Sequence, residues 1–509
     1  MSPNRKLAYA LIALVCAGYI ALRLWNLTAS CLWFDEIFSV HAAEHSWNSI
    51  LSFIALDIIH PPFFYLLLKV WKSAGGDGLL WLRTLPVIFA VLAIVPLIAL
   101  CRSLRLGPWV QLIALFLLAV NGSMIKYSQE VRMYSLLLCL SLFSYWLFTR
   151  YIIKGKGFAP LLIVNIILVY AHYFGWFVVF SEMIAIVILR REKWLKVVVM
   201  FGITLLAFIP WIYAIYGTFG QGEGLSQNIG WMERPGVAAV VQFVLNLVEP
   251  FYYAASSVDR WSIYRVSIPL LILLLTVSVL FFLNWEDHCD DDKFAVRLLF
   301  VFVLVPVFLA FAASRVLPYS IWGTRHLIIV FAPAAILFGV GITRLRNSGF
   351  RTASMTLLVL FAAYGFVLEA QRPAPRYIWC GWEQLAPIAE SSGVTRIYVF
   401  EDLVAYHFWF AMRNDTAKPE ILKITDLGAM PEDKAYFLPR GFEEVRSVKF
   451  DDITDNRLWL AYRGQPIDLN KLPLALFLLR GYTIIDSRVV AADQENAIMV
   501  ELQLEKHPQ

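Results

Sequence analysis

Side chains that could carry out chemistry gather in a few short stretches of a chain that is otherwise strongly apolar. Charged side chains are costly in a membrane, and those near the ends of apolar segments usually mark a functional cavity. Carboxylate, imidazole and guanidinium groups mix at one set of segment ends, whereas the opposite ends carry mostly plain lysine and arginine. The candidate residues are Asp35, Glu36, His60, Glu130, Arg132, Tyr134, Arg325 and His326.

This combination of side chains suits the transfer of a sugar from a lipid phosphate. A sugar that leaves its phosphate carrier releases an anion, and arginine binds phosphate oxygens through two hydrogen bonds at once. The acceptor hydroxyl or amine needs a carboxylate base within hydrogen-bond reach. An inverting displacement requires the carboxylate on one side of the reacting carbon and the cations on the other, and the set contains both ingredients.

The elements that must position these residues are transmembrane helices. The chain has 509 residues, of which 60% are hydrophobic and 16% are charged, whereas soluble domains are about 45–50% apolar and about 25% charged. Apolar runs of about 18 or more residues are long enough to cross a bilayer. We predict about eleven spans, at residues 7–27, 83–101, 109–125, 135–153, 159–172, 174–190, 197–216, 264–283, 297–314, 326–343 and 353–370. No small-residue cleavage site follows the first run, so we expect it to be a helix and not a signal peptide.

Lysine and arginine set the predicted orientation. With Arg5 and Lys6 inside the cell, every strongly basic short loop falls on the same side, as the positive-inside rule requires. An odd number of spans then places the end of the chain outside. We therefore expect a multi-pass protein of the cell inner membrane, with a cytoplasmic N-terminus and an extracytoplasmic C-terminal domain.

Two outer loops are long. The loop at 28–82 is too apolar to lie in water, so helices at 46–57 and 63–71 are expected to lie in the membrane interface, separated by the breaker Pro61-Pro62. The loop at 217–263 is rich in glycine and is expected to be mobile.

The chain changes character after about residue 376. Alternating apolar runs predict strands at 396–400, 458–462, 483–485 and 497–504, with a helix at 382–390. We therefore divide the chain into a membrane domain, 1–370, and a soluble α/β domain, 376–509. Six cysteines contain no CxxC pair, which gives no metal or redox motif. Cys31 and Cys380 both fall on the outer side, where a disulfide between them could form, although lone cysteines in apolar proteins are usually small buried side chains.

Three sequence motifs resemble those of the GT-C glycosyltransferases. They are WFDEIFS at 33–39, HPPFFY at 60–65 and YSQEVRMY at 127–134, and their order and spacing match. The similarity is greatest to the bacterial branch that includes aminoarabinose transferases of lipid A and protein mannosyltransferases. It covers roughly residues 1–370. The resemblance implies a hexosyl- or pentosyltransferase that takes its sugar from a polyprenyl phosphate and passes it to a lipid, glycan or protein acceptor.

The resemblance also implies roles for the acidic residues. Asp35 corresponds to the catalytic base that activates the acceptor, with Glu36 as its neighbour. Glu130 corresponds to a second acidic position that orients the acceptor or the donor sugar, and Tyr134 ends the same motif.

The basic residues correspond to donor-phosphate ligands. His60 stands where some relatives have a lysine before Pro-Pro, and a histidine is neutral part of the time near pH 7. Arg132 and Arg325 are therefore preferred as phosphate ligands. The pair Arg325-His326 resembles the family's Arg-Tyr motif, with histidine in place of tyrosine.

Simpler interpretations of these residues remain open. The acidic pair could be an ordinary interfacial pair, Pro61-Pro62 a plain turn, and Arg325 a side chain that extends to the interface. We expect His172 and Lys126 to be structural, and His41 and His45 to be surface residues.

Other functions are less well supported. A transporter or flippase of lipid-linked glycans is the alternative function, but the inverted repeats and charged mid-membrane helices of carriers are not evident. A non-catalytic scaffold would not need the acidic motif. Nucleic acid is not an expected partner, because the basic residues lie in short clusters. No metal or cofactor is predicted, since the sequence shows no closed ligand set.

Overall fold

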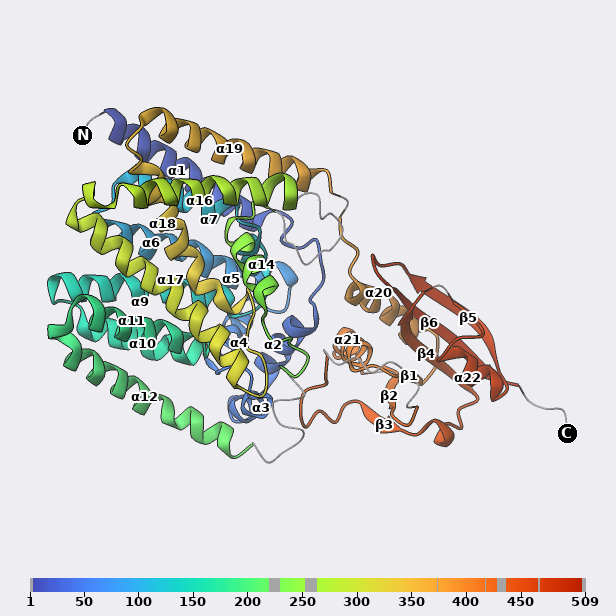
Figure 1. Ribbon diagram of the computed structural model, residues 1–509. Coiled ribbons are helices and arrows are strands. Elements are labelled where there is room, and N and C mark those ends of the chain that lie inside the picture. Colours follow the sequence, from blue (N-terminus) through green and yellow to red (C-terminus); the bar gives the residue numbers. More distant parts are fainter. Residues whose placement is uncertain are drawn as a thin grey trace. The chain divides into compact units, whose positions relative to one another are not determined.

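The chain divides into two compact units, whose elements are drawn in Figure 1. The first unit comprises residues 1–27, 58–219 and 232–372, and the second comprises 28–57, 220–231 and 373–509. The computed structural model describes residues 3–218, 229–251, 263–372, 374–416, 418–427, 436–465 and 467–505. Much of the glycine-rich loop predicted to be mobile, 219–228 and 252–262, lies outside these residues.

The first unit is helical. Its helices are α1 (Pro3–Leu24), α4 (Phe63–Gly75), α5 (Leu79–Leu92), α6 (Ile94–Ser103), α7 (Pro108–Val120), α8 (Gly122–Gln129), α9 (Tyr134–Lys154), α10 (Phe158–Ala171), α11 (Gly175–Leu189), α12 (Trp194–Tyr216), α14 (Val237–Val248), α16 (Ile268–Leu283), α17 (Asp290–Val316), α18 (Phe331–Thr343) and α19 (Ser348–Ala370). Short turns of helix, η1 (Arg191–Lys193), η2 (Ile263–Ser267), η3 (Trp285–Asp287) and η4 (His326–Val330), precede or join some of them.

Apolar length makes these helices suited to a membrane. Among the described residues, eight helical segments are long and apolar enough to cross a bilayer, and four shorter apolar helices accompany them. Every span predicted from sequence falls on one helix or on two consecutive ones. The helical membrane fold is therefore confirmed, while the number of crossings stays a prediction.

A buried arginine joins three of these helices close to their ends. The last carbonyl groups of a helix have no partner within it, and Arg23 of α1 donates hydrogen bonds to the carbonyls of Leu118 and Ala119 at the end of α7, at 2.7 and 2.9 Å. Gln129, the last residue of α8, in turn donates to the carbonyls of Arg23 and Trp25 at 3.1 and 2.8 Å. The side chains that follow α8 are thereby held against α1.

A tight turn separates α10 from α11. The helix α10 ends at Ala171 and α11 begins at Gly175, so the two predicted spans are two helices and not one. A Cβ atom at Gly175 would lie 2.7 Å from the carbonyl oxygen of Leu168, which only glycine avoids. This close approach places His172 in the turn.

Three polar side chains form a closed ring between α9, α10 and α11. The hydroxyl of Ser144 lies 2.6 Å from both Glu182 and the amide oxygen of Asn165, and the Asn165 amide donates to the other Glu182 oxygen at 2.7 Å. Ser144 has one hydrogen for two acceptors. The missing hydrogen must come from Glu182, so the ring is complete when that carboxyl group is protonated.

The second unit contains a mixed six-stranded sheet in the order β3-β2-β1-β4-β6-β5. Its elements are α2 (Phe34–Glu44), α3 (Ile50–Asp57), α20 (Ile378–Ser391), β1 (Arg396–Val399), α21 (Asp402–Met412), β2 (Glu420–Ile424), β3 (Arg446–Val448), η5 (Phe450–Asp452), β4 (Arg457–Gly464), α22 (Leu474–Leu479), β5 (Tyr482–Val490) and β6 (Asn496–Leu504). The pairs β1-β2, β2-β3 and β1-β4 are parallel, whereas β4-β6 and β5-β6 are antiparallel.

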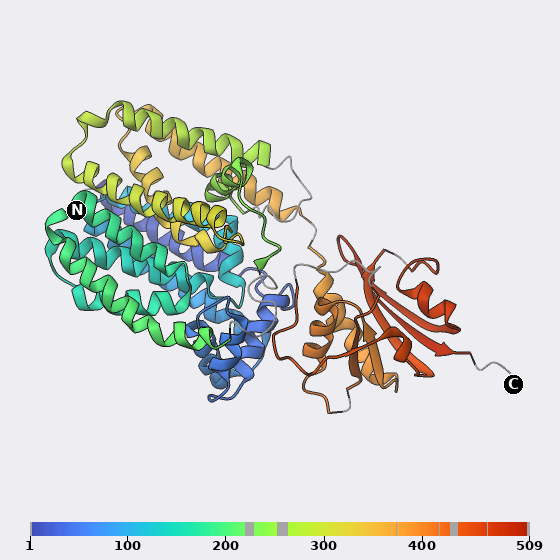
Figure 2. The same ribbon diagram turned by 60° about the horizontal axis from the view of Figure 1, so that its bottom comes forward.

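Alternation along β4 gives the sheet two buried faces. Leu458, Leu460 and Tyr462 join the apolar core that includes α22, while the indole of Trp459 points the other way and donates a hydrogen bond to Ser392, next to α20. Figure 2 shows α20 and α21 covering one face of the sheet and α22 beside the other. All four strands and the helix predicted for this region are confirmed, and the helices predicted in the first outer loop are α3 and α4.

Candidate functional site

The acidic motif occupies the first turn of α2. Trp33 precedes the helix in an extended conformation, and Glu36, fully buried, accepts a hydrogen bond from the backbone N–H of Trp33 at 3.1 Å. This contact caps the helix start. Asp35 is half-buried in the same turn, where the helix dipole favours negative charge. The Glu36 carboxylate therefore helps to fix the start of its own helix.

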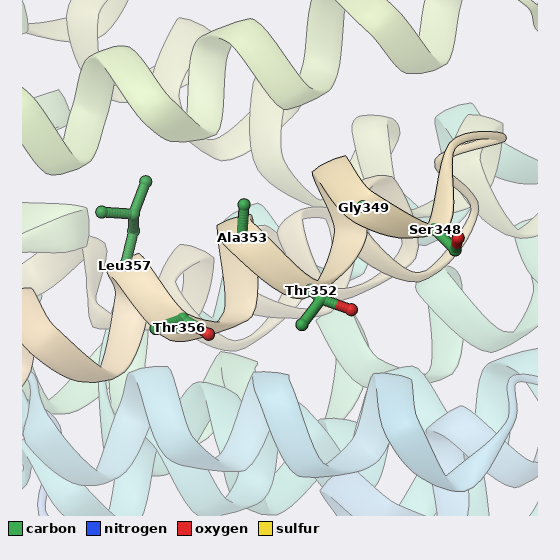
Figure 3. Close-up of a pocket in the computed structure, with 6 residues that line it drawn as sticks. All are labelled: Ser348, Gly349, Thr352, Ala353, Thr356 and Leu357. Carbon is green, nitrogen blue, oxygen red and sulfur yellow. The ribbon is translucent and has the colours of Figure 1, made fainter.

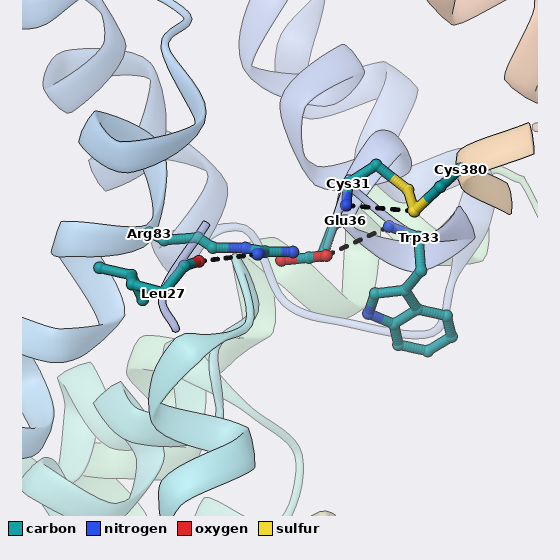
Figure 4. Close-up of a disulfide and its surroundings, with 6 residues drawn as sticks. All are labelled: Leu27, Cys31, Trp33, Glu36, Arg83 and Cys380. Carbon is teal, nitrogen blue, oxygen red and sulfur yellow. Dashed lines mark hydrogen bonds between the residues drawn. A yellow bond between two sulfur atoms is a disulfide. The ribbon is translucent and has the colours of Figure 1, made fainter. Parts of the chain in front are cut away.

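A disulfide bond stands just before the acidic motif. Cys31 is joined to Cys380 of α20, across 349 residues of sequence, and its backbone N–H also approaches the Cys380 sulfur at 3.3 Å. Figure 4 shows this link beside Trp33 and Glu36. The disulfide considered from sequence is therefore present.

The first unit brings three histidine rings and a tyrosine together. The ring centroids of His60 and His172 are 5.1 Å apart, and those of His172 and His326 are 5.4 Å apart. Tyr134 lies 6.3 Å from both His172 and His326. All four side chains are buried. Residues far apart in sequence therefore form one cluster, which we call the histidine cluster.

The members of the histidine cluster lie at the first residue of a helical element or in the turn that precedes one. His60 precedes Pro62, the residue before α4, and Tyr134 is the first residue of α9. His172 lies in the turn before α11, and His326 begins η4. Tyr134 begins α9, where free backbone N–H groups and the positive end of the helix dipole favour an anion.

Hydrogen bonds assign the proton on two of the rings. The Nδ1 atom of His172 accepts from the backbone N–H of Phe174 at 3.0 Å, so the neutral ring carries its hydrogen on Nε2. The Nδ1 atom of His326 donates to the carbonyl of Ile321 at 3.2 Å, which leaves Nε2 as an acceptor. Within the described part of the chain, His172 Nε2 and His60 Nδ1 are buried without a hydrogen-bond partner. Both atoms are available to a ligand.

The electrostatic environment keeps His60 neutral. Burial lowers the pKa of His60 well below its ordinary value of 6.5, and the positive charge of Arg132 lowers it further, with smaller contributions from the other two histidines and Arg325. Positive charge near this ring therefore comes from the two arginines. This result agrees with the preference for Arg132 and Arg325 as phosphate ligands, although their roles stay predictions.

The second predicted carboxylate is buried next to the arginine of its own motif. Glu130 follows α8, and its carboxylate lies 3.7 Å from the Lys126 ammonium group. Its carbonyl accepts a hydrogen bond from the backbone N–H of Arg132 at 2.6 Å. This tight turn between α8 and α9 fixes the backbone of the motif. The ion pair with Glu130 is the contact that Lys126 makes here.

Two histidines make contacts that the sequence did not indicate. His172 contacts both of the other histidine rings, and its structural role stays a prediction. Its position between two apolar runs, at the same side as the other candidates, was the available signal. His41 was expected on the surface, and this is wrong, because it is buried in α2 among the aromatic rings of Tyr406, Trp409 and Phe442.

A metal site and a phosphate cavity each have requirements that the described residues can be compared with. Within the described residues, no three or more His, Cys, Asp and Glu side chains are grouped as metal ligands. A cavity of about 700 Å³ lies along one face of α19 and is lined by Ser348, Gly349, Thr352, Ala353, Thr356 and Leu357 (Figure 3). These side chains are small and uncharged, so this cavity does not suit a phosphate group.

The fold is similar to that of solved membrane transferases. ArnT from Cupriavidus metallidurans, an aminoarabinose transferase solved with undecaprenyl phosphate, matches with a TM-score of 0.61 at 12% identity, over 96% of this chain and 97% of that chain. The same protein in the apo state matches with a TM-score of 0.57 at 12% identity, over 97% and 98%. No protein-family model and no curated protein sequence matches the chain. The GT-C fold expected from the three motifs is therefore confirmed.

Proposed function

We propose that the protein is a membrane glycosyltransferase that moves a sugar from a polyprenyl phosphate to a lipid, glycan or protein acceptor. The observation that carries the proposal is the histidine cluster, where buried imidazoles meet beside two arginines. A buried site of this composition suits a phosphate, and the fold matches a protein solved with undecaprenyl phosphate.

The donor phosphate binds through charge and hydrogen bonds in this scheme. Arg132 and Arg325 neutralise the phosphate, since guanidinium groups bind its oxygens in pairs and stay charged when buried. The Nε2–H group of His172 donates to a phosphate oxygen without first taking up a proton. Negative charge grows on the carrier phosphate as the sugar leaves, so these donors stabilise the transition state more than the ground state.

The acceptor reacts with Asp35 as its base. The acceptor oxygen or nitrogen attacks the anomeric carbon while its proton passes to the Asp35 carboxylate. The bond from the anomeric carbon to the phosphate oxygen breaks, and its electron pair leaves with the polyprenyl phosphate. One displacement of this kind inverts the anomeric configuration. Glu36 is better assigned to holding the helix start, because its carboxylate caps α2.

The disulfide supports the proposed side of the membrane. Disulfides persist in oxidising compartments and are rare in the cytosol, and Cys31 and Cys380 belong to the loop and the domain that are expected outside. The positive-inside rule independently predicts the same orientation. We therefore propose that the reaction takes place at the extracytoplasmic face of the cell inner membrane.

The test is Asp35→Asn, assayed on a panel of purified polyprenyl-phosphate sugars. Loss of the base should lower transfer by about 10²- to 10⁴-fold, the usual contribution of general-base catalysis, while undecaprenyl phosphate still binds. Asp35→Glu is the matched control, because it keeps a carboxylate and should retain part of the activity. Full transfer by the asparagine variant would overturn the assignment of the base, and glycan transport without transfer would favour a flippase.

A further inference from the structure

The segment that carries the acidic motif belongs to the same compact unit as the C-terminal domain. The residues of the histidine cluster belong to the other unit, with the membrane helices. The acidic motif follows the first membrane helix directly in sequence, so only the tertiary structure shows this division. It raises the question of what holds α2 and its Asp35 in place.

The disulfide is the first attachment of the segment. Cys31 lies at the start of the segment, and Cys380 lies in α20, which packs on β5 and β6. This packing is close, since a Cβ atom at Gly381 would stand 2.6 Å from that of Ala497 in β6. The covalent bond therefore ties the chain just before Asp35 to the sheet of the C-terminal domain.

The second attachment is one face of α2 packed on α21. Phe34, next to Asp35, contacts the rings of Tyr406 and His407 at centroid distances of 5.2 and 6.1 Å. One face of a helix repeats at about every 3.6 residues, and His41 continues that face by a hydrogen bond of 2.9 Å between its Nδ1 and the Tyr406 hydroxyl. Asp35 is rotated by about 100° from this face, so the contacts with α21 hold the helix through residues other than Asp35.

An ion pair attaches the C-terminal end of α2 to the residue that follows α21. The guanidinium of Arg413, just after α21, lies 3.0 Å from the carboxylate of Glu44, the last residue of α2. Both side chains are largely shielded from solvent, at 14% and 25% exposure. This ion pair is the third attachment, and a fourth follows at the end of α3, where Arg440 donates to the carbonyl of Leu56 at 3.1 Å.

We propose that the C-terminal domain is the positioning scaffold of the acidic motif, and that Tyr406, Arg413 and Cys380 set the location of Asp35 during transfer. This inference rests on the proposed function. The attachments hold the start, the middle and the end of the segment, and all of them come from residues beyond 373. None of these residues touches the substrate in this scheme, so they are positioning residues. The domain then controls the acceptor step and leaves donor binding to the membrane unit.

The experiment is a charge swap in the full-length protein in detergent or nanodiscs. Arg413→Glu places two carboxylates together and should release α2, whereas Glu44→Arg combined with Arg413→Glu restores an ion pair of opposite polarity. Transfer from a polyprenyl-phosphate sugar and binding of undecaprenyl phosphate are measured for each variant. Hydrogen exchange of residues 34–44 reports whether the helix has been released.

The single variant should lower kcat by about tenfold or more, because misplacing a catalytic group by 1 Å can cost on the order of 10²-fold. The donor KM and undecaprenyl phosphate binding should change by less than about twofold, and the swapped pair should recover kcat. A general folding defect would lower kcat and undecaprenyl phosphate binding together, and the swapped pair would not restore them.

A second pair of variants tests the covalent attachment. Cys31→Ser with Cys380→Ser should also reduce kcat at constant donor KM, and Cys289→Ser, which removes an exposed free thiol, is the control. Unchanged kcat in a variant whose α2 exchanges faster would overturn the scaffold proposal. Failure of the proposed function is distinguishable, because it would appear as full transfer by Asp35→Asn while the wild-type protein is active.

Discussion

The buried His407 should make the C-terminal domain sensitive to mild acid. This histidine lies in α21, beside Phe34 of α2, and its Nδ1 donates to the carbonyl of Leu403 at 2.8 Å. Its Nε2 is buried without a hydrogen-bond partner in the described part of the chain. Burial lowers the pKa of His407 from 6.5 to about 4, the Leu403 hydrogen bond acts in the opposite direction, and Arg463 lowers it slightly further.

The sign and size of the effect follow from linkage. When the helix opens, His407 regains a pKa of about 6.5 and binds a proton that the folded form excludes. The stability contribution is therefore complete above pH 6.5 and is lost as the pH falls toward 4. At pH 5, which lies between these two pKa values, the loss of stability is about 2 kcal/mol.

The assay is hydrogen exchange of peptides from α21 at several pH values, corrected for the intrinsic exchange rate. The free energy of opening should fall by about 2 kcal/mol between pH 8 and pH 5. His407→Asn keeps an N–H donor for Leu403 but does not titrate, so its opening free energy should fall much less over the same range. Equal pH dependence in the wild type and the variant would refute the reasoning.

Two further predictions concern the membrane unit. Glu182→Gln should preserve the ring with Ser144 and Asn165, since its amide supplies the hydrogen that the protonated carboxyl group supplies, and its thermal stability should match the wild type. Glu182→Leu should lower the free energy of unfolding by about 1–3 kcal/mol, because the buried side chains of Ser144 and Asn165 lose their partner. Equal melting temperatures of the two variants would contradict a ring in which Glu182 is protonated. Arg325→Ala should weaken binding of undecaprenyl phosphate more than it raises the acceptor KM, and an equal effect on both would remove Arg325 from the phosphate site.

Much of the fold could be predicted from the sequence, because it depends on local patterns. Apolar length alone located most helices of the membrane unit, since a bilayer imposes the same requirement on every span. The exception is α14, which lies at Val237–Val248 in the loop expected to be mobile. Alternation located β1, β4, β5 and β6. The strands β2 and β3 and the helix α21 were not predicted. The helix α21 is apolar on all sides because it is buried throughout, so it carries no amphipathic period to detect.

The candidate site was predicted in its residue types but not in its arrangement. Asp35, Arg132 and Arg325 could be selected because charge at the end of an apolar segment is costly and therefore informative. The place of His172 beside the other two rings could not be predicted, because one histidine in a short turn carries no motif. Its contacts with His60 and His326 depend on how α4, α11 and η4 pack, and no local pattern encodes that packing.

The sequence by itself determined the membrane class, the helical segments and the chemical types at the site, because each follows from local apolarity or local charge cost. Only the tertiary structure decided which of the two compact units holds the imidazoles and which holds the acidic motif. It brought the three imidazoles together in the membrane unit, and it attached the acidic motif to the C-terminal domain through Cys380, Tyr406 and Arg413. The physical reason is that a disulfide or an ion pair across more than 300 residues, such as the 349 between Cys31 and Cys380, depends on where the folded chain brings its partners.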